Sequence, residues 1–198
     1  MTHSHWILLF AWILYYVVHS ILAATVVKDF FAKKMRKYFR YYRLCYSIFA
    51  AITLMYLLMY QYSFESPMLI KSVLLKYISL IILLIPGFII MFISIKKYFL
   101  LLSGVRSIYE AAPRAELKVE GIHRYVRHPL YLGTILFVWG LFFIFPMLNN
   151  LIAVVLLTGY VWIGIGFEEK KLVKEFGKKY EDYISEVPVL FPGFKIKK

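Results

Sequence analysis

Two short clusters in the second half of the chain carry side chains able to do chemistry. The first is Gly121-Ile-His-Arg-Tyr-Val-Arg-His-Pro129, in which arginines and histidines gather directly before a proline. Proline favours the first position of a helix, and a helix N-terminus attracts anions through its unpaired N–H groups. The second cluster is the carboxylate pair Glu168-Glu169. Basic groups beside carboxylates suit a ligand that carries both charges.

The apolar segments between the clusters predict that the clusters meet. Stretches 130–148 and 151–167 are joined only by Asn149-Asn150, a dipeptide typical of turns. Two antiparallel helices around this turn would place His128 and Glu168 within about 5 Å of the same height, at about 1.5 Å per residue. The residues alone leave an alternative open: basic anchors for lipid phosphates beside a solvated helix face.

The composition indicates a membrane protein. Of 198 residues, 62% are hydrophobic and 18% are charged, whereas a soluble domain has about half and about a quarter. The single cysteine, Cys45, excludes an intrachain disulfide and a multi-cysteine metal site, and we expect no metal. Five stretches lack Asp, Glu, Lys and Arg and approach the ~20 residues that a membrane crossing needs. They are 6–27, 44–60, 77–95, 130–148 and 151–167.

These stretches predict an all-α integral membrane protein with five transmembrane helices in a single domain, residues 1–198. We interpret the first stretch as a retained span because it is too long for a signal peptide and lacks a basic leader. Pro86-Gly87 should kink the third helix, since proline removes a backbone donor.

The distribution of basic residues predicts the direction of insertion. Lys and Arg number 24 against 11 acidic residues, and 22 of the 24 lie in the segments 28–43, 96–127 and 170–198. With five spans, these segments share one side of the bilayer, which the positive-inside rule makes cytoplasmic. We therefore expect the N-terminus outside, the C-terminus inside, attraction to anionic lipid, and no nucleic-acid partner.

The two cytoplasmic segments, about 96–129 and 168–198, are where chemistry is expected. Apolar residues in the second are spaced as one helix face over 170–186, which favours an interfacial amphipathic helix ending before Pro188. They are Leu172, Phe176, Tyr180, Tyr183 and Val187. The apolar segment 187–194 is expected to fold back over the site.

The motifs resemble the isoprenylcysteine carboxyl methyltransferase family, which is related to the membrane phospholipid methyltransferases. The resemblance rests on Tyr125-Val-Arg-His-Pro-Leu-Tyr-Leu-Gly133, Glu168-Glu-Lys-Lys-Leu172 and Phe176-Gly-Lys-Lys-Tyr180, in the same order and spacing. It covers about residues 118–190, and a five-span chain resembles the short prokaryotic members. A prokaryotic cytoplasmic membrane is the expected location.

The resemblance implies an S-adenosylmethionine-dependent methyltransferase whose cofactor lies in a pocket made by the last two spans, the loop and the tail helix. It implies a catalytic role for Arg127, His128 and Glu168. The implied cofactor-binding residues are Tyr125, Arg127, His128, Tyr131, Gly133, Glu168 and Glu169.

The methyl acceptor is expected to reach the site from the bilayer. His19 is an ionisable side chain inside the first span, and Arg43 stands at the entry to the second. Intramembrane ionisable residues are functional candidates, although a neutral histidine also serves to bind a neighbouring helix. We predict His19, Arg43 and Arg124 as substrate residues. The acceptor stays open between an isoprenylcysteine carboxylate, a lipid amine and a small thiol.

Two other classes of protein compete with the methyltransferase. The C-terminal region of membrane sterol reductases resembles the same hairpin, which would make the chain an NADPH-dependent reductase. A non-enzymatic membrane scaffold is the third possibility. Cofactor binding separates the three.

Overall fold

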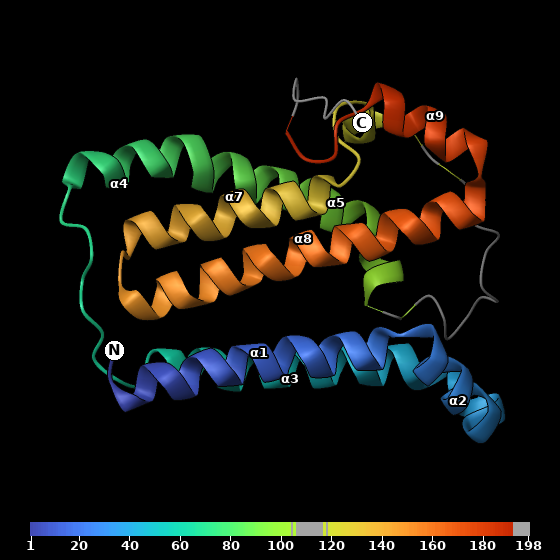
Figure 1. Ribbon diagram of the computed structural model, residues 1–198, viewed down its shortest axis with the longest axis horizontal. Helices are drawn as coiled ribbons and strands as arrows, with labels where there is room; N and C mark the ends of the chain where they lie inside the picture. Colours follow the sequence, from blue (N-terminus) through green and yellow to red (C-terminus); the bar gives the residue numbers. More distant parts are fainter. Residues whose placement is uncertain (104, 106–116, 118, 192–198) are drawn as a thin grey trace. The chain divides into compact units, whose positions relative to one another are not determined.

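The computed structural model describes residues 1–103, 105, 117 and 119–191. Within these residues the regular secondary structure is helical, apart from one isolated β-bridge between Met68 and Met147 (Figure 1). Four helical stretches are long and apolar enough to cross a membrane: His3–Ala23, Thr25–Gln61, Val73–Lys96 and Leu148–Phe176. The prediction of an all-α membrane protein agrees with this arrangement.

The expectation of five spans is not confirmed. The fourth expected span is α7 (Pro129–Ile144), which has only 16 residues. At about 1.5 Å per residue it is about 24 Å long, short of the ~30 Å hydrocarbon core. The first expected span also ends early, because Ala24 adopts extended backbone between α1 (His3–Ala23) and α2 (Thr25–Met35).

The chain forms two compact units, the first made mainly of Met1–Leu69 and Met147–Leu156. In it α1 and α3 (Tyr42–Gln61) run antiparallel, since Tyr60 hydrogen-bonds to the carbonyl of Ser4 and Tyr46 lies beside His19. In the sequence, α1 and α3 are separated by α2 and the 3₁₀-helix η1 (Arg36–Tyr41). These two helices carry most of the basic residues of the segment 28–43.

The dipeptide Asn149-Asn150 does not form a turn, although the sequence predicts one there. It lies in the first turn of α8 (Leu148–Phe176), and both side chains are buried. Gln61 donates to the side chain of Asn150 at 2.8 Å, while Asn149 donates to the carbonyl of Gln61 at 2.8 Å. The turn instead contains Phe145 and Pro146, which keeps the predicted hairpin but moves its bend toward the N-terminus.

The second unit contains Ile70–Lys97 and, among the other described residues, 117, 119–146 and 157–191. Its first helix runs from α4 (Val73–Ser79) through a π-helical turn, η2 (Leu80–Leu84), into α5 (Ile85–Leu102). The π turn directly precedes Pro86, where the sequence predicts a kink; such turns accommodate an interrupted hydrogen-bond ladder.

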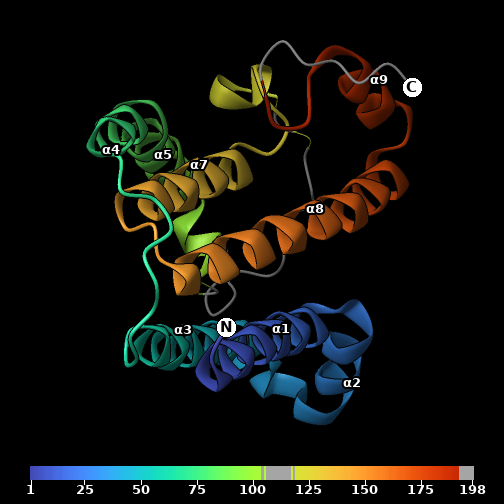
Figure 2. The same cartoon turned by 60° about the vertical axis from the view of Figure 1, so that its left-hand side comes forward.

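In this unit α7 packs between α5 and α8, as both views show (Figures 1 and 2). Glycines allow the backbones of α5 and α7 to approach closely: a Cβ at Gly133 would lie 2.6 Å from the nitrogen of Met91. The other side of α7 meets α8 in antiparallel register, because Trp139 donates to Thr158 and Tyr131 donates to Glu168.

The helix expected over 170–186 is divided. One helix, α8, continues without a break from Leu148 to Phe176, and Gly177 then takes a positive φ of 57° before α9 (Lys178–Glu186). The predicted apolar face of the tail packs against the chain itself rather than standing free for the membrane interface. Tyr180, Tyr183 and Val187 form its buried centre with Leu172 and Phe176 beside them.

Candidate active site

The site begins where the helix α7 begins. Pro129 is its first residue and His128 its N-cap, as the sequence predicts. Immediately before it, the guanidinium of Arg127 donates from Nε to Oε1 of Glu169 at 2.7 Å and from Nη2 to Oε2 at 3.0 Å. The side chain of Arg127 is 8% exposed, so this is a nearly buried, bidentate ion pair. The basic cluster and the carboxylate pair therefore meet.

The C-terminal segment completes the surroundings of Arg127. Its Nη1 donates to the carbonyl oxygens of Ile184 and Val187. The backbone N–H groups of Arg127 and His128 donate to Pro188 and Val189 at 2.9 and 3.2 Å. Beyond them, Leu190 is fully buried among Val126, Leu132 and other residues of α7 and α8. The described part of the expected cover, 187–191, thus folds back onto the site; residues 192–194 lie outside the described residues.

Glu168 is the carboxylate of the pair that faces outward. Its side chain is 43% exposed, compared with 20% for Glu169. The hydroxyl of Tyr131 donates to Glu168 Oε2 at 2.9 Å. His128 is buried between the two acids, with Nε2 3.1 Å from Glu169 Oε1 and Nδ1 3.8 Å from Glu168 Oε2. Its ring stacks on Tyr131 at a centroid distance of 5.5 Å.

Two tyrosines of α9 belong to the site, although the sequence reasoning assigned that helix no chemical role. The hydroxyl of Tyr180 donates to Glu169 Oε1 at 3.4 Å, and that of Tyr183 donates to the carbonyl of His123 at 2.6 Å. Burial, and then the negative charge of Glu169, raise the pKa of Tyr180, which keeps its hydroxyl protonated as a donor. The sequence signal that could have identified Tyr180 and Tyr183 is their shared position on the apolar face of the tail.

The remaining predicted residues of this region take different positions. The ring of Tyr125 is 67% exposed, and Arg124 is also exposed. Gly133 is buried against the backbone of α5 near Met91 and Gly87, so its lack of a side chain serves helix packing there.

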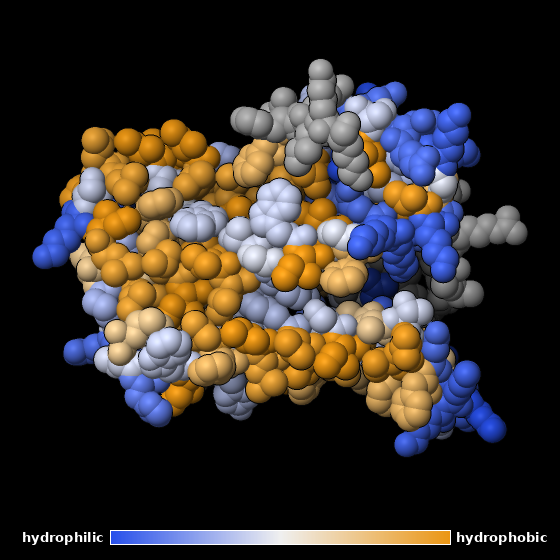
Figure 3. Space-filling model, viewed as in Figure 1, coloured by the Kyte–Doolittle hydropathy of each residue, from blue (hydrophilic) through white to orange (hydrophobic). Residues whose placement is uncertain are grey.

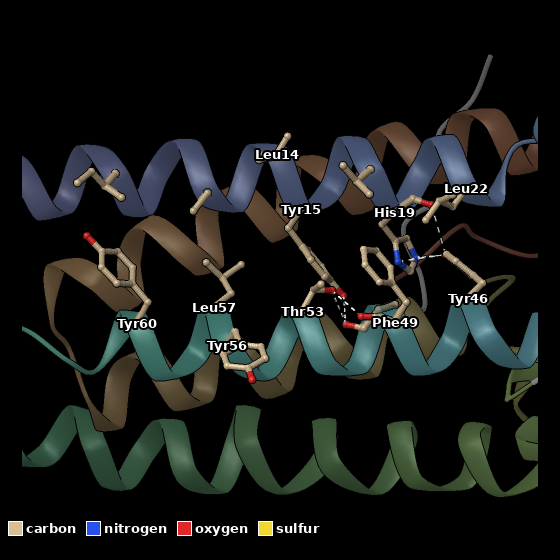
Figure 4. A pocket seen from close by; sticks show the side chains of 14 residues that line it. Leu14, Tyr15, His19, Leu22, Tyr46, Phe49, Thr53, Tyr56, Leu57 and Tyr60 are labelled. Carbon is tan, nitrogen blue, oxygen red and sulfur yellow. Dashed lines mark hydrogen bonds between the residues drawn. The ribbon is translucent and has the colours of Figure 1, made fainter.

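His19 and Arg43 lie in the first unit. Both ring nitrogens of His19 are within 3.0 Å of the hydroxyl of Tyr46, and the exposed Arg43 stands one helical turn before Tyr46 on α3. His19 and Tyr46 line one end of an apolar groove of about 430 Å³ between α1 and α3 (Figure 4).

Comparison with known proteins identifies the family. The family described as phospholipid methyltransferase matches residues 75–179, which include α7, α8 and both clusters of the site. This is more than half of the chain, so the protein belongs to the phospholipid methyltransferase family.

Several curated relatives match part of the chain. A methanethiol S-methyltransferase of Crocosphaera subtropica is 36% identical over 99 residues, covering 46% of this chain and 37% of its own length. One of Mycobacterium tuberculosis is 34% identical over 98 residues, covering 46% and 38%. A protein-S-isoprenylcysteine O-methyltransferase of Schizosaccharomyces pombe is 38% identical over 80 residues, covering 38% and 33%. The chain thus spans little more than a third of the length of these relatives. No solved structure matches it significantly.

Proposed function

We propose that the protein is a membrane methyltransferase that uses S-adenosylmethionine and acts on a lipophilic acceptor. The observation that carries this proposal is the outward carboxylate of Glu168 beside the buried Arg127–Glu169 pair, in the segment that defines the family. The relatives named above are methyltransferases, which supports methyl transfer as the reaction.

The chemistry of the donor set fits S-adenosylmethionine. Glu168, whose side chain is 43% exposed and accepts a hydrogen bond from Tyr131, offers acceptors for an ammonium group or for ribose hydroxyls. The N-terminus of α7, with the exposed Arg124 nearby, favours a carboxylate. The exposed ring of Tyr125 offers a face for a planar base. When bound, S-adenosylmethionine supplies an electrophilic methyl group on a sulfonium sulfur.

The buried residues hold this arrangement in place. Arg127 is committed to Glu169 and to the carbonyl oxygens of Ile184 and Val187, so in our proposal it positions α7, α8 and the tail. His128, locked between Glu169 and the ring of Tyr131, orients Glu168. Rigid placement is the main contribution that a protein makes to a transfer between two bound groups. Gly133 supports the site from behind by bringing α5 close.

The protonation state of the methyl acceptor decides whether the site must supply a base. An isoprenylcysteine carboxylate arrives ionised and needs no base, whereas a thiol or a lipid amine must lose a proton. A base would then be needed near the acceptor, and the imidazole of His128 or of His19 is our candidate. The thiol methyltransferases among the relatives make a small thiol as well supported as the carboxylate. His19, Arg43 and Arg124 remain our proposed substrate residues.

The proposed orientation places this chemistry at the cytoplasmic surface of a prokaryotic membrane. The basic segments 28–43, 96–127 and 170–198 share that surface when the apolar helices, including the short α7, each cross once. The N-terminus is then outside and the C-terminus inside. Cysteine accessibility, measured in intact cells with single cysteines at Thr2 and Lys179, tests this arrangement.

Binding of S-adenosylhomocysteine tests the proposed function directly. Isothermal titration of the detergent-purified protein should give micromolar affinity, and Glu168→Gln should abolish it. Glu175→Gln is the matched control, since Glu175 is an exposed carboxylate on the same helix and touches none of the site residues described above. Retained binding in folded Glu168→Gln protein would overturn the site assignment.

Absence of binding would separate the competing classes. Titration with NADPH follows on the same folded preparation. Binding of NADPH without S-adenosylhomocysteine would make the chain a reductase of related fold. Binding of neither ligand would leave a membrane scaffold.

A further inference from the structure

The groove between α1 and α3 is apolar along nearly its whole length. Leu14, Leu57 and Phe49 are among the residues that line it, and the hydroxyls of Tyr15 and Thr53 are turned into hydrogen bonds with backbone carbonyls (Figure 4). Its volume of about 430 Å³ lies within the ~300–1,000 Å³ typical of ligand sites. Such a lining suits a hydrocarbon chain.

One end of the groove, here called the polar end, carries its histidine. Tyr60 lines the far end, whereas His19, hydrogen-bonded to Tyr46, lines the near end (Figure 4). Arg43 lies about one helical turn before Tyr46 on α3, and the spacing of three residues places both side chains on the same face of the helix. A ligand that fills the groove therefore has an apolar tail and a head that meets this pair and Arg43.

Charge identifies the head as an anion. Seven basic residues and one acidic residue lie between Lys28 and Arg43, and all seven basic side chains are exposed. They continue from the polar end of the groove into α2 and η1, where Figure 3 shows the hydrophilic surface beside the hydrophobic surface of α1. Arginine binds phosphate in a bidentate manner, and clustered lysines raise the local concentration of anionic lipid.

We propose that this groove is a binding site for an anionic glycerophospholipid, with one acyl chain between α1 and α3 and the phosphate at Arg43. The second chain stays in the bilayer, because the groove is lined by a single stripe of residues from each helix. This site shares His19 and Arg43 with the substrate residues proposed above, but its test measures lipid binding and does not depend on any activity.

Native mass spectrometry of the detergent-purified protein tests the proposal with three probes: dioleoyl phosphatidylglycerol, dioleoyl phosphatidylcholine and oleate. We expect one phosphatidylglycerol per chain, retained more strongly than either of the others. Arg43→Gln should weaken its binding about tenfold, as expected for loss of charge-assisted hydrogen bonds. Lys179→Gln, which removes an exposed charge from α9, should leave it unchanged.

A second pair of variants tests the place of the acyl chain. Ala11→Phe fills the groove and should reduce phosphatidylglycerol occupancy, whereas Ile13→Phe adds bulk to the same helix outside the groove and should not. Equal binding of the zwitterionic lipid would overturn the proposal, as would an Arg43→Gln effect no larger than that of Lys179→Gln. Stronger binding of oleate would assign the groove to a long-chain carboxylate instead. Thermal unfolding confirms that each variant is folded, and Arg43→Gln carries the test if Ala11→Phe is not.

Discussion

Arg127 donates to both carboxylate oxygens of Glu169, at 2.7 and 3.0 Å, across 42 residues of sequence. The same guanidinium reaches the backbone of Ile184 and Val187, so one side chain joins the start of α7, the end of α8 and the tail. This guanidinium is committed to protein acceptors, whereas the side chain of Glu168 is 43% exposed. In our proposal, Glu168 is therefore the side chain that meets the ligand.

Arg127→Lys should destabilise the second unit despite conserving the charge. Lysine cannot form the planar, bidentate contact, and its ammonium cannot also reach both carbonyls of the tail. We expect a loss of about 1–3 kcal/mol, the usual range for hydrogen bonds to charged groups. Thermal unfolding in detergent measures it. An unchanged melting temperature would show that the pair contributes nothing to the fold.

Tyr131→Phe should weaken ligand binding more than stability. The substitution removes the hydrogen bond to Glu168, whose carboxylate is 43% exposed and able to rebind water. Affinity for S-adenosylhomocysteine should fall about three- to tenfold, as expected for one net hydrogen bond. Isothermal titration gives the affinity, with Tyr77→Phe, a change to an exposed tyrosine of α4, as the control. A drop in melting temperature without a change in affinity would contradict this assignment.

Leu190→Ala should be among the most damaging changes in the tail. Its side chain is fully buried with Val126, Leu132 and Ile165, and truncation of a buried leucine costs about 2–5 kcal/mol. Phe191→Ala, next in the chain and 42% exposed, should cost less. Unfolding of both variants in the same detergent makes the comparison. Equal losses would mean that Leu190 does not anchor the segment.

Glycines on α7 and α8 should respond in opposite ways to alanine. A Cβ at Gly133 would lie 2.6 Å from a backbone nitrogen of α5, so Gly133→Ala must push two helices apart. At Gly166 on α8 a methyl group would meet no described atom of another segment within 4 Å, so Gly166→Ala should be neutral or stabilise by up to about 1 kcal/mol. Thermal unfolding distinguishes the two, and tolerance of Gly133→Ala would refute the close packing.

Tyr180 should make stability sensitive to alkaline pH. Its pKa is raised in the folded protein, first by burial and then by Glu169. The contribution of this raised pKa to the free energy of folding is fully present below about pH 10, the ordinary tyrosine pKa. It is lost as the pH rises further. The wild-type melting temperature should therefore fall more steeply above pH 10 than that of Tyr180→Phe. Parallel curves would exclude Tyr180 as the cause.

Much of this arrangement could be predicted because strong local signals support it. Pro129 sets the start of α7, and two uncharged runs around a short turn leave only an antiparallel pair, which brings Arg127 to Glu169. The break at Ala24 had no such signal, since neither Gly nor Pro marks it. Asn149 and Asn150 have the local preference of a turn, but their side chains find long-range partners in Gln61, which outweighs that preference.

The sequence also could not predict which arginine and which glutamate of the site would be buried. Arg127 and Arg124 are equivalent as residue types, and so are Glu168 and Glu169. Only the folded tail buries one of each pair and leaves the other exposed. In the same way, the apolar face of α9 satisfies the pattern of an interfacial helix, and the contacts of Tyr180 and Tyr183 decide against it.

The hydrogen bonds from Arg127 and His128 to Pro188 and Val189 have a consequence for biosynthesis. A chain emerges from the ribosome N-terminus first, so the helices α1 to α8 can enter the bilayer before the tail exists. Until residues 184–188 have been translated, the backbone N–H and the Nη1 group of Arg127 lack these acceptors, although Glu169 is already present. A chain truncated before Pro188 should therefore keep its apolar helices but leave the backbone N–H groups of Arg127 and His128, at the start of α7, without their acceptors.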